Sequence, residues 1–312
     1  MSNNHQTVGA VGANTAGPGQ TGLARGTRRL LGGARLGELL GVVPFIAFAV
    51  LFLLAPTMYV VGAAFVDKAG NFTFANIGRL FEDQILASFW ISIRISAASA
   101  ILGAVIGLLI ALAIIRGRLP SWIRSTVMTF SGVASNFAGI PLAFAFLATV
   151  GRLGLVTVVL KFLGLDVYRA GFNLLSFWGL TLTYLYFQIP LMILIIAPAI
   201  DGLRKEWSEA AATLGATPWQ FWRYVGLPVL WPNLLGTLSL LFANAFGAVA
   251  TAYALTGMSI NMVTIQLYAQ IRGDALGDAG LGAALALGMI VITALANVIY
   301  LVVRARAERW LK

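Results

Sequence analysis

The side chains that could do chemistry inside the apolar segments of this chain are polar and uncharged. They gather in three long runs without charge, and the members are Ser131, Ser135, Asn136, Thr181, Tyr184, Gln188, Asn244 and Thr251. Thr181, Tyr184 and Gln188 fall at i, i+3 and i+7, which places them on one face of a helix. Such a face either lines a polar path for a solute or forms hydrogen bonds between helices, worth about 0.6 to 2 kcal/mol each. The candidates for a path are Ser135, Asn136, Tyr184, Gln188, Asn244 and Thr251.

The sequence lacks the residues that several other kinds of chemistry require. The chain has no cysteine and one histidine, His5, which excludes disulfides, thiolate metal sites and a metal or haem site built from several imidazoles. The sequence also has no GxxxxGK[ST] string for nucleotide phosphates, no nucleophilic triad and no cluster of carboxylates. We therefore expect a chain that is not an enzyme and that has neither a metal site nor a cofactor of its own.

The elements that position the polar side chains are long apolar runs. Of the 312 residues, 59% are apolar and only 10% are charged, and the mean hydropathy is +0.88. A soluble surface needs roughly 25% charged residues, so a secreted or cytosolic enzyme is excluded. A helix crosses a hydrocarbon core of about 30 Å with about 20 residues. Six uncharged runs are long enough: 39–66, 95–115, 125–151, 170–200, 224–271 and 279–303.

These runs predict an all-α membrane protein with six transmembrane helices. The fifth run has room for two spans, but its second half contains Ser259, Asn261, Gln266 and Gln270 and is typical of an interfacial or re-entrant segment. We place the spans at about 41–65, 95–115, 125–151, 174–200, 233–256 and 279–303. They form one domain, 39–305, between a disordered basic N-terminal tail (1–38) and a short C-terminal tail (306–312).

Lysine and arginine are distributed unevenly over the loops. The two tails and the second and fourth loops hold 14 of these residues, and the other loops hold 7. Basic residues that flank spans are retained in the cytoplasm, so we expect both termini there. The net charge of +10 then reflects topology and contact with the lipid bilayer, and no motif indicates a nucleic-acid partner.

The fourth loop, residues 201–232, is far longer than the two to eight residues that usually join helices. The stretch from Glu206 to Leu214 favours a helix, and Gly215 is a natural residue to follow its end. Thr217-Pro218 predicts the start of a second helix, which we expect to end before Leu227-Pro228. This second helix is either buried against the spans or presented to another protein, because it carries Trp219, Phe221, Trp222 and Tyr224.

The same loop carries a spaced motif. Glu209-Ala210-Ala211, three residues, Gly215, nine residues, Val225, one residue and Leu227-Pro228 resemble the EAA loop of the inner-membrane permeases of binding-protein-dependent ABC importers. The one departure is Val225, where these permeases usually have isoleucine. The stretch from Asn71 to Phe81 is similar to an N-F-T-x-x-N-x-x-x-L-F segment of the same permeases. In general character the chain resembles the branch associated with polyamines, thiamine, ferric iron, phosphonates or oxyanions.

The resemblance implies a type I importer permease bundle of the MetI-like kind in the bacterial inner membrane. In that family the EAA loop forms a coupling helix that docks on an ABC ATPase subunit, which binds ATP and magnesium. By resemblance Glu209 makes a polar contact there, Ala210 and Ala211 permit close approach, and Gly215 permits the turn. Val225, Leu227 and Pro228 complete the motif. The implied partners are ATPase subunits, a second permease of similar fold or a second copy of this chain, and an external solute-binding protein.

Three alternatives remain open at this point. A sugar-type ABC permease has the same architecture with a different solute. An autonomous secondary transporter or channel is disfavoured because no charged residue lies within the six expected spans, whereas ion-coupled carriers generally keep ionisable groups or broken helices near the midplane. A membrane-embedded assembly protein would use the aromatic loop to recruit a partner without transport.

Overall fold

The structure is a computed structural model that describes residues 36–117, 119–272 and 277–308. The expected N-terminal tail up to residue 35 and residues 309–312 of the C-terminal tail lie outside the described residues. Within the described ranges the chain is helical and has no β-strand, and one isolated antiparallel bridge joins Val66 and Phe72.

Six segments of the described residues are long and apolar enough to cross a membrane, which confirms the all-α, six-span fold class. The first is built from α1 (Leu36–Ala49), η1 (Val50–Leu54) and α2 (Ala55–Ala63), the second is α4 (Asp83–Arg116), and the third joins α6 (Ile140–Val150) to α7 (Leu155–Phe162). The fourth is α8 (Phe177–Asp201), the fifth joins α10 (Pro218–Phe221), η2 (Trp222–Gly226) and α11 (Leu227–Phe246), and the sixth is α14 (Ala279–Glu308). The shorter helices are α3 (Ala75–Arg79), α5 (Ser121–Ala134), α9 (Lys205–Thr213), α12 (Val249–Thr256) and α13 (Val263–Arg272).

The described residues up to Pro56 belong to a different unit from the rest of the chain. The described part of this unit is an apolar helix in which the five residues of η1 adopt a π-helical turn. The large apolar side chains are exposed, and the rings of Phe48 and Phe52 stack with their centroids 5.1 Å apart. An apolar helix that exposes such side chains is suited to a hydrocarbon environment.

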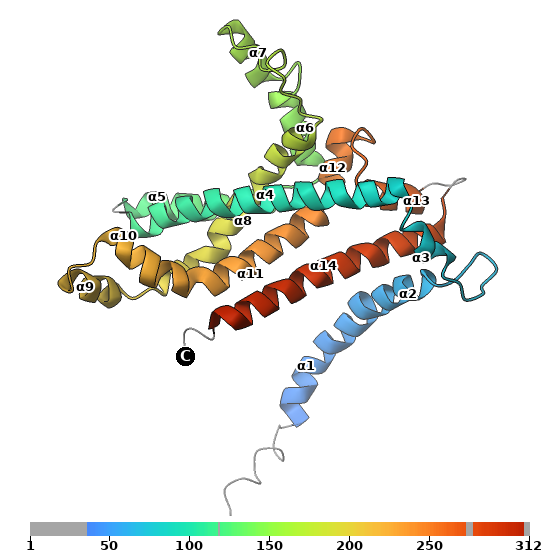
Figure 1. Ribbon diagram of the computed structural model, residues 1–312, viewed down its shortest axis with the longest axis horizontal. Coiled ribbons are helices and arrows are strands. Elements are labelled where there is room, and N and C mark those ends of the chain that lie inside the picture. The colour runs from blue at the N-terminus through green and yellow to red at the C-terminus, as the bar shows by residue number, and fades with distance from the viewer. Residues whose placement is uncertain (1–35, 118, 273–276, 309–312) are drawn as a thin grey trace, which may run out of the picture. The chain divides into compact units, whose positions relative to one another are not determined.

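In the second unit, from Thr57 onward, α4, α8 and α11 lie side by side (Figure 1). The 34 residues of α4 span about 51 Å, and Asp83 in its first turn and Arg116 in its last turn both complement the helix dipole. Gly103 and Gly107 of α4 face α8, where an added Cβ would lie 2.7 Å from Cβ of Gln188 and 2.6 Å from Cβ of Met192. Only glycine therefore allows the two helices to pack this closely.

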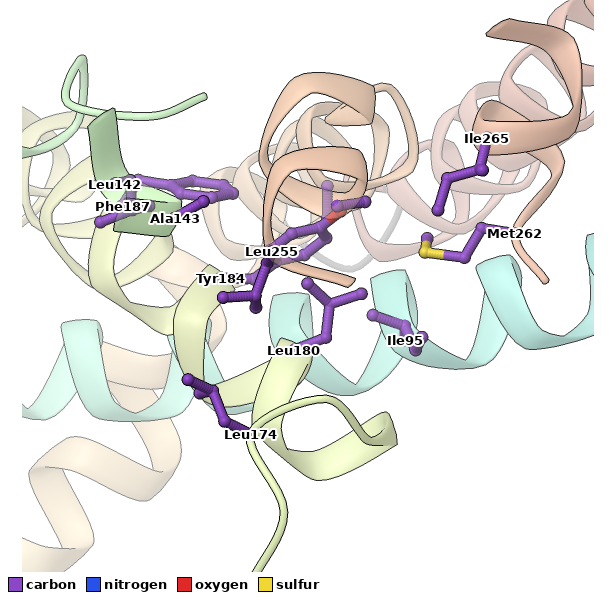
Figure 2. Close-up of a cluster of buried hydrophobic side chains, with 12 residues drawn as sticks. Ile95, Leu142, Ala143, Leu174, Leu180, Tyr184, Phe187, Leu255, Met262 and Ile265 are labelled. Carbon is purple, nitrogen blue, oxygen red and sulfur yellow. The ribbon is translucent and has the colours of Figure 1, made fainter. Parts of the chain in front are cut away.

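Buried apolar side chains fill the space on either side of this close contact. One cluster joins α4, α6, α8, α12 and α13 through residues such as Ile95, Leu142, Leu180 and Leu255 (Figure 2). A second cluster joins the other half of α8 to α4 and α11 and includes Ile196, Ile200, Leu203 and Leu230. The core thus follows α8, which is the most buried of the six spans.

Three of the expected spans differ from the helices observed. Instead of a span over 95–115, α4 runs from Asp83 to Arg116 and includes Arg94. Instead of one span over 125–151, α5 ends at Ala134 and α6 begins at Ile140; instead of one span over 233–256, α11 ends at Phe246 and α12 begins at Val249. Neither break contains a charged residue, so a search for uncharged runs passes over both. The polar segment 258–271 forms most of α13, whose first residues, Val263, Thr264 and Ile265, are buried.

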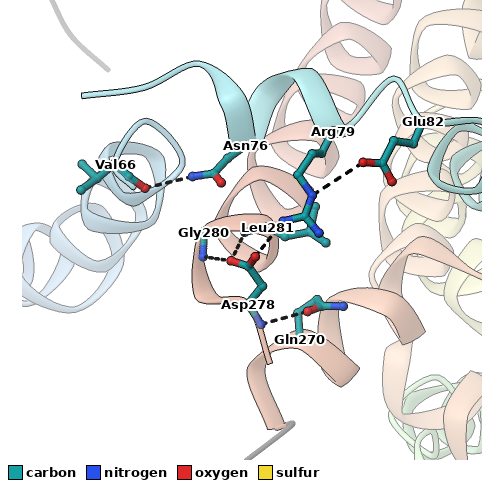
Figure 3. Close-up of polar contacts among 8 residues, drawn as sticks. All are labelled: Val66, Asn76, Arg79, Glu82, Gln270, Asp278, Gly280 and Leu281. Atoms are coloured by element: carbon teal, nitrogen blue, oxygen red, sulfur yellow. Dashed lines mark hydrogen bonds and ion pairs between the residues drawn. The ribbon is translucent and has the colours of Figure 1, made fainter. Parts of the chain in front are cut away.

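At the end of α4 opposite Arg116, polar contacts join residues within the 66–82 segment and attach this segment to Asp278, which precedes α14 (Figure 3). Asn76 Nδ2 donates to the carbonyl of Val66 at 2.9 Å, and Arg79 Nη1 donates to Asp278 Oδ2 at 2.7 Å. The hydrogen bond from Arg79 holds the pKa of the Asp278 carboxyl below its ordinary value. Asp278 also caps α14, because its Oδ1 accepts from the backbone N–H groups of Gly280 and Leu281.

Candidate functional site

The two helix breaks come together at a cavity of about 370 Å³. Ser135 and Gly139 from the α5–α6 break line it, together with Asn244, Thr251 and residues 247–250 around the α11–α12 break. The described residues that line this cavity include no charged side chain. We call it the helix-break cavity.

Two hydrogen bonds fix the breaks to each other and to α8. The backbone N–H of Gly139 donates to Thr251 Oγ1 at 2.7 Å, and the hydroxyl of Tyr184 donates to the carbonyl of Ala248 at 3.0 Å. Gly139 has φ +75° and ψ −148°, a conformation that residues with a Cβ rarely adopt. The shape of the cavity therefore depends on a glycine and on two polar side chains from neighbouring helices.

The six candidates for a polar path divide into two groups. Ser135, Asn244 and Thr251 line the helix-break cavity, although Thr251 is itself bonded to Gly139. The other three do not line it. Asn136 is exposed and donates to the carbonyl of Gly132, and Tyr184 and Gln188 are fully buried and donate to backbone carbonyls of Ala248 and Leu241.

Sequence reasoning did not identify the backbone of the two breaks. Both α6 and α12 begin at the cavity, so the first N–H groups of each helix are not used within the helix. Gly139 followed by Pro141 is a typical start of a helix, and Gly247 after an apolar run is a typical end. These two signals could have placed the breaks.

The local prediction for the 201–232 loop is confirmed in its first half. Helix α9 covers Lys205–Thr213, Gly215 adopts φ +78°, and α10 begins at Pro218. Thr217 and Gln220 form a capping box in which Gln220 N–H donates to Thr217 Oγ1 at 3.3 Å and Thr217 N–H donates to Gln220 Oε1 at 2.7 Å. The pattern of helix, glycine turn and capped helix thus follows from side chains that the sequence shows directly.

The expectation that the second helix ends before Leu227-Pro228 is wrong. The chain stays helical from Pro218 to Phe246, because η2 inserts a π-helical turn in which Leu227 N–H donates to the carbonyl of Trp222. Pro228 directly follows this π-helical turn as the second residue of α11, and the helix continues past it although proline has no N–H. Val225, Leu227 and Pro228 are therefore part of a continuous helix that leads into the fifth span.

The aromatic side chains of this loop face two ways. Phe221 is 8% exposed and Trp222 packs with the cluster of Ile200 and Leu230, whereas Trp219 is 72% exposed and Tyr224 is 68% exposed. An added Cβ at Gly226 would lie 2.5 Å from the Trp222 ring, so this glycine makes room for the indole. The inward pair anchors the loop to the bundle.

The part of the loop from Glu209 to Trp219, which we call the loop tip, projects beyond that anchor. Glu209, Ala210 and Gly215 are exposed, Ala211 is half-buried, and Leu214 is 88% exposed. The loop tip thus presents a carboxylate, small side chains and two large apolar side chains, a combination suited to docking on another protein. Within the described residues, no group of three His, Cys, Asp or Glu side chains could hold a metal ion there or elsewhere.

Comparisons with known proteins agree on one type of protein. A family model described as the binding-protein-dependent transport system inner membrane component matches residues 103–309. The molybdenum transport system permease protein of Mycobacterium tuberculosis is 28% identical over 66% of this chain and 74% of that protein. The sulfate transport system permease protein of Escherichia coli (strain K12) is 27% identical over 67% of this chain and 72% of that protein.

One solved structure supports the fold. The crystal structure of a bacterial ABC transporter involved in the import of the acidic polysaccharide alginate covers 89% of this chain and 96% of the compared chain, with a TM-score of 0.69 and 20% sequence identity. At this identity the match shows the fold and not the solute. The helical arrangement described above is therefore one that already occurs in solved membrane proteins.

Proposed function

Because the chain belongs to the binding-protein-dependent transport system inner membrane components, a family of ABC importer permease subunits, we propose that it moves a small polar solute inward across the membrane when a partner hydrolyses ATP. It is a multi-pass inner membrane protein with six membrane-spanning helices in its described part. The observation that carries the proposal is the exposed loop tip on a buried anchor. Such a loop has the shape and side chains of a docking site for an ATPase subunit.

In the proposed cycle the ATPase subunit binds ATP and magnesium, and this chain binds neither. Closure of the ATPase displaces the loop tip, and the continuous helix from α10 to α11 transmits that displacement to the α11–α12 break. The helix-break cavity then opens toward one face of the membrane or the other. The basic residues of the tails and of the 201–232 loop support an orientation with both termini and the loop tip in the cytoplasm.

We propose a sulfate- or molybdate-type oxyanion as the first solute to test. Two relatives named for sulfate and molybdenum transport support it, and so do two helix starts at the helix-break cavity, where backbone N–H groups carry partial positive charge. Polyamines, thiamine, phosphonates, iron and sugars are the other classes that the test must include. The lining without side-chain charge supports weak binding in the membrane and recognition by an external solute-binding protein.

The test is uptake into proteoliposomes that contain the complex purified with its partners. We expect labelled sulfate or molybdate to enter only when ATP is inside the ATPase-facing compartment and the binding protein is on the other side. Uptake of a polyamine, thiamine or a sugar instead would correct the proposed solute, and the proposed ATP-driven mechanism would still stand. Uptake without ATP and without the binding protein would contradict the proposal and indicate an autonomous transporter.

A further inference from the structure

Two arginines from other helices hold the chain at the point where α8 leads into the loop. Arg116, the last residue of α4, donates from Nη2 to the backbone carbonyls of Ile200 at 3.1 Å and Leu203 at 2.6 Å. Arg124 of α5 places Nη2 2.6 Å from Asp201 Oδ2. We call Arg116, Arg124 and Asp201 the arginine clasp.

The arginine clasp lies at the C-terminal end of α8, where the backbone carbonyls need hydrogen-bond donors. The last carbonyls of an α-helix have no partner within the helix and carry partial negative charge. One guanidinium nitrogen of Arg116 donates to two carbonyls: that of Ile200 in the last turn of α8, which also accepts from the Leu203 N–H group, and that of Leu203 just beyond the helix. Arg124 and Asp201 are each 43% exposed at the side chain, so their ion pair adds little to the free energy of unfolding. The ion pair fixes position more than it stabilises the fold.

The position that the clasp fixes is the base of the loop tip. Helix α9 begins at Lys205, two residues after Leu203, and Ile200 and Leu203 are buried in the same apolar cluster as Leu230. The other end of the loop is anchored by Phe221. The segment from Ile200 to Leu203 is therefore a fixed base, and Arg204 alone joins it to α9, the helix that leads into the loop tip.

The clasp also joins that base to α4 and α5. Helix α4 is packed against α8 at Gly103 and Gly107, with no room for a Cβ at either position. At its far half, α4 also contacts α13, where Val263 N–H donates to Ser92 Oγ at 2.9 Å. Arg116 thus connects the base at Leu203 to a helix that reaches the opposite end of the bundle.

We propose that Arg116 and Arg124 are positioning residues for ATP-driven translocation, which link movement of the loop tip to movement of α4 and α8. This inference rests on the proposed function. The inference predicts that variants of these arginines uncouple two quantities that are normally linked in a permease complex, namely the ATP hydrolysed and the solute moved. Loss of the clasp leaves the loop tip exposed for the ATPase and breaks the link from its base to α4.

The test measures ATP hydrolysis and uptake of labelled sulfate or molybdate in the same proteoliposomes. The variants are Arg116→Gln, Arg116→Lys, Arg124→Asp and the exchanged pair Arg124→Asp with Asp201→Arg. We expect Arg116→Gln to reduce solute moved per ATP about tenfold, since hydrogen bonds from a charged donor are lost. The co-purified ATPase and its hydrolysis rate stay within about twofold of the unmodified complex. Arg116→Lys keeps the charge and restores coupling in part, and the exchanged pair restores what Arg124→Asp loses.

Arg306→Ala is the matched control, because it removes one positive charge from an exposed position near the end of α14. It should leave solute moved per ATP unchanged. Normal coupling in Arg116→Gln and Arg124→Asp, within a complex that transports, would overturn the inference. A parallel fall of hydrolysis, uptake and complex yield without rescue by the exchanged pair would overturn it too, since it indicates a structural role alone. Absence of ATP-driven uptake in the unmodified complex would instead contradict the proposed function.

Discussion

Asn244 and Gln188 carry similar amide groups at different depths of the bundle. Asn244 is exposed and lines the helix-break cavity, whereas Gln188 is fully buried and its Nε2 donates to the carbonyl of Leu241 at 2.8 Å. The Oε1 atom of Gln188 has no hydrogen-bond partner among the described residues. The amide of Asn244 can therefore contact a solute, whereas the amide of Gln188 links α8 to α11.

Asn244→Leu should therefore reduce uptake and leave the amount of folded protein unchanged. The expected loss is about fivefold, which corresponds to one hydrogen bond worth about 1 kcal/mol. Gln188→Ala should instead lower the free energy of unfolding by about 1 to 3 kcal/mol, because it removes a buried hydrogen-bond donor and leaves a void. Ser99→Ala is the control for a buried α4 position. Equal uptake by Asn244→Leu and the unmodified protein would remove the case for this cavity as part of the path.

The ion pair between Asp278 and Arg79 leads to a prediction of how acid affects the free energy of unfolding. The pKa of Asp278 is lowered in the folded protein, first by the hydrogen bond from Arg79, so it stabilises the fold above the pKa of an unfolded aspartate, about 3.9. This contribution is lost as the pH falls through the folded pKa. Thermal unfolding of detergent-solubilised protein should show Asp278→Asn less stable than the unmodified protein at pH 7, with the difference vanishing once the pH falls below the folded pKa of Asp278. Glu82→Gln, at a longer 3.6 Å contact to Arg79, should show a smaller difference. A difference that persists unchanged in acid would contradict the assignment.

At the scale of elements, the break between α5 and α6 depends on Gly139. Gly139→Ala should cost about 1 to 3 kcal/mol, because φ +75° with ψ −148° is strained for a residue with a Cβ. Uptake should fall, since the cavity loses its shape. Gly132→Ala is the matched control, because Gly132 lies within α5 with nothing within 4 Å of an added Cβ. Normal uptake by Gly139→Ala would show that the break does not depend on this residue.

The loop tip makes a separate prediction about assembly. Glu209→Lys should leave the protein in the membrane and abolish association with the ATPase, because it reverses an exposed charge on the proposed docking surface. Gly215→Ala should weaken association through a backbone cost of about 1 kcal/mol at φ +78°, and Gly215→Asn should be milder, since asparagine tolerates this region better. Co-purification of the ATPase with each variant measures the effect. Unchanged recovery of the ATPase with Glu209→Lys would contradict the docking role.

At the scale of the whole molecule, some features followed from the sequence because their causes are local. The number of spans follows from the number of long uncharged runs, and the capping box at Thr217 and Gln220 is built from neighbours in the chain. The π-helical turn before Pro228 and the partners of Tyr184 and Gln188 depend on packing between helices far apart in sequence. A helical spacing of polar residues cannot distinguish a side chain that lines a cavity from one that bonds a neighbouring backbone.

The central claim is that this chain works as one subunit of an ATP-driven complex. The measurement that tests it most directly is gentle purification of the tagged protein from its native membranes, with mass spectrometry of the proteins that accompany it. The account predicts an ABC ATPase subunit, together with a second six-span permease or a second copy of this chain, and predicts that Glu209→Lys releases the ATPase. Recovery of the chain alone, or only with copies of itself, from membranes that retain the unmodified loop would contradict the account.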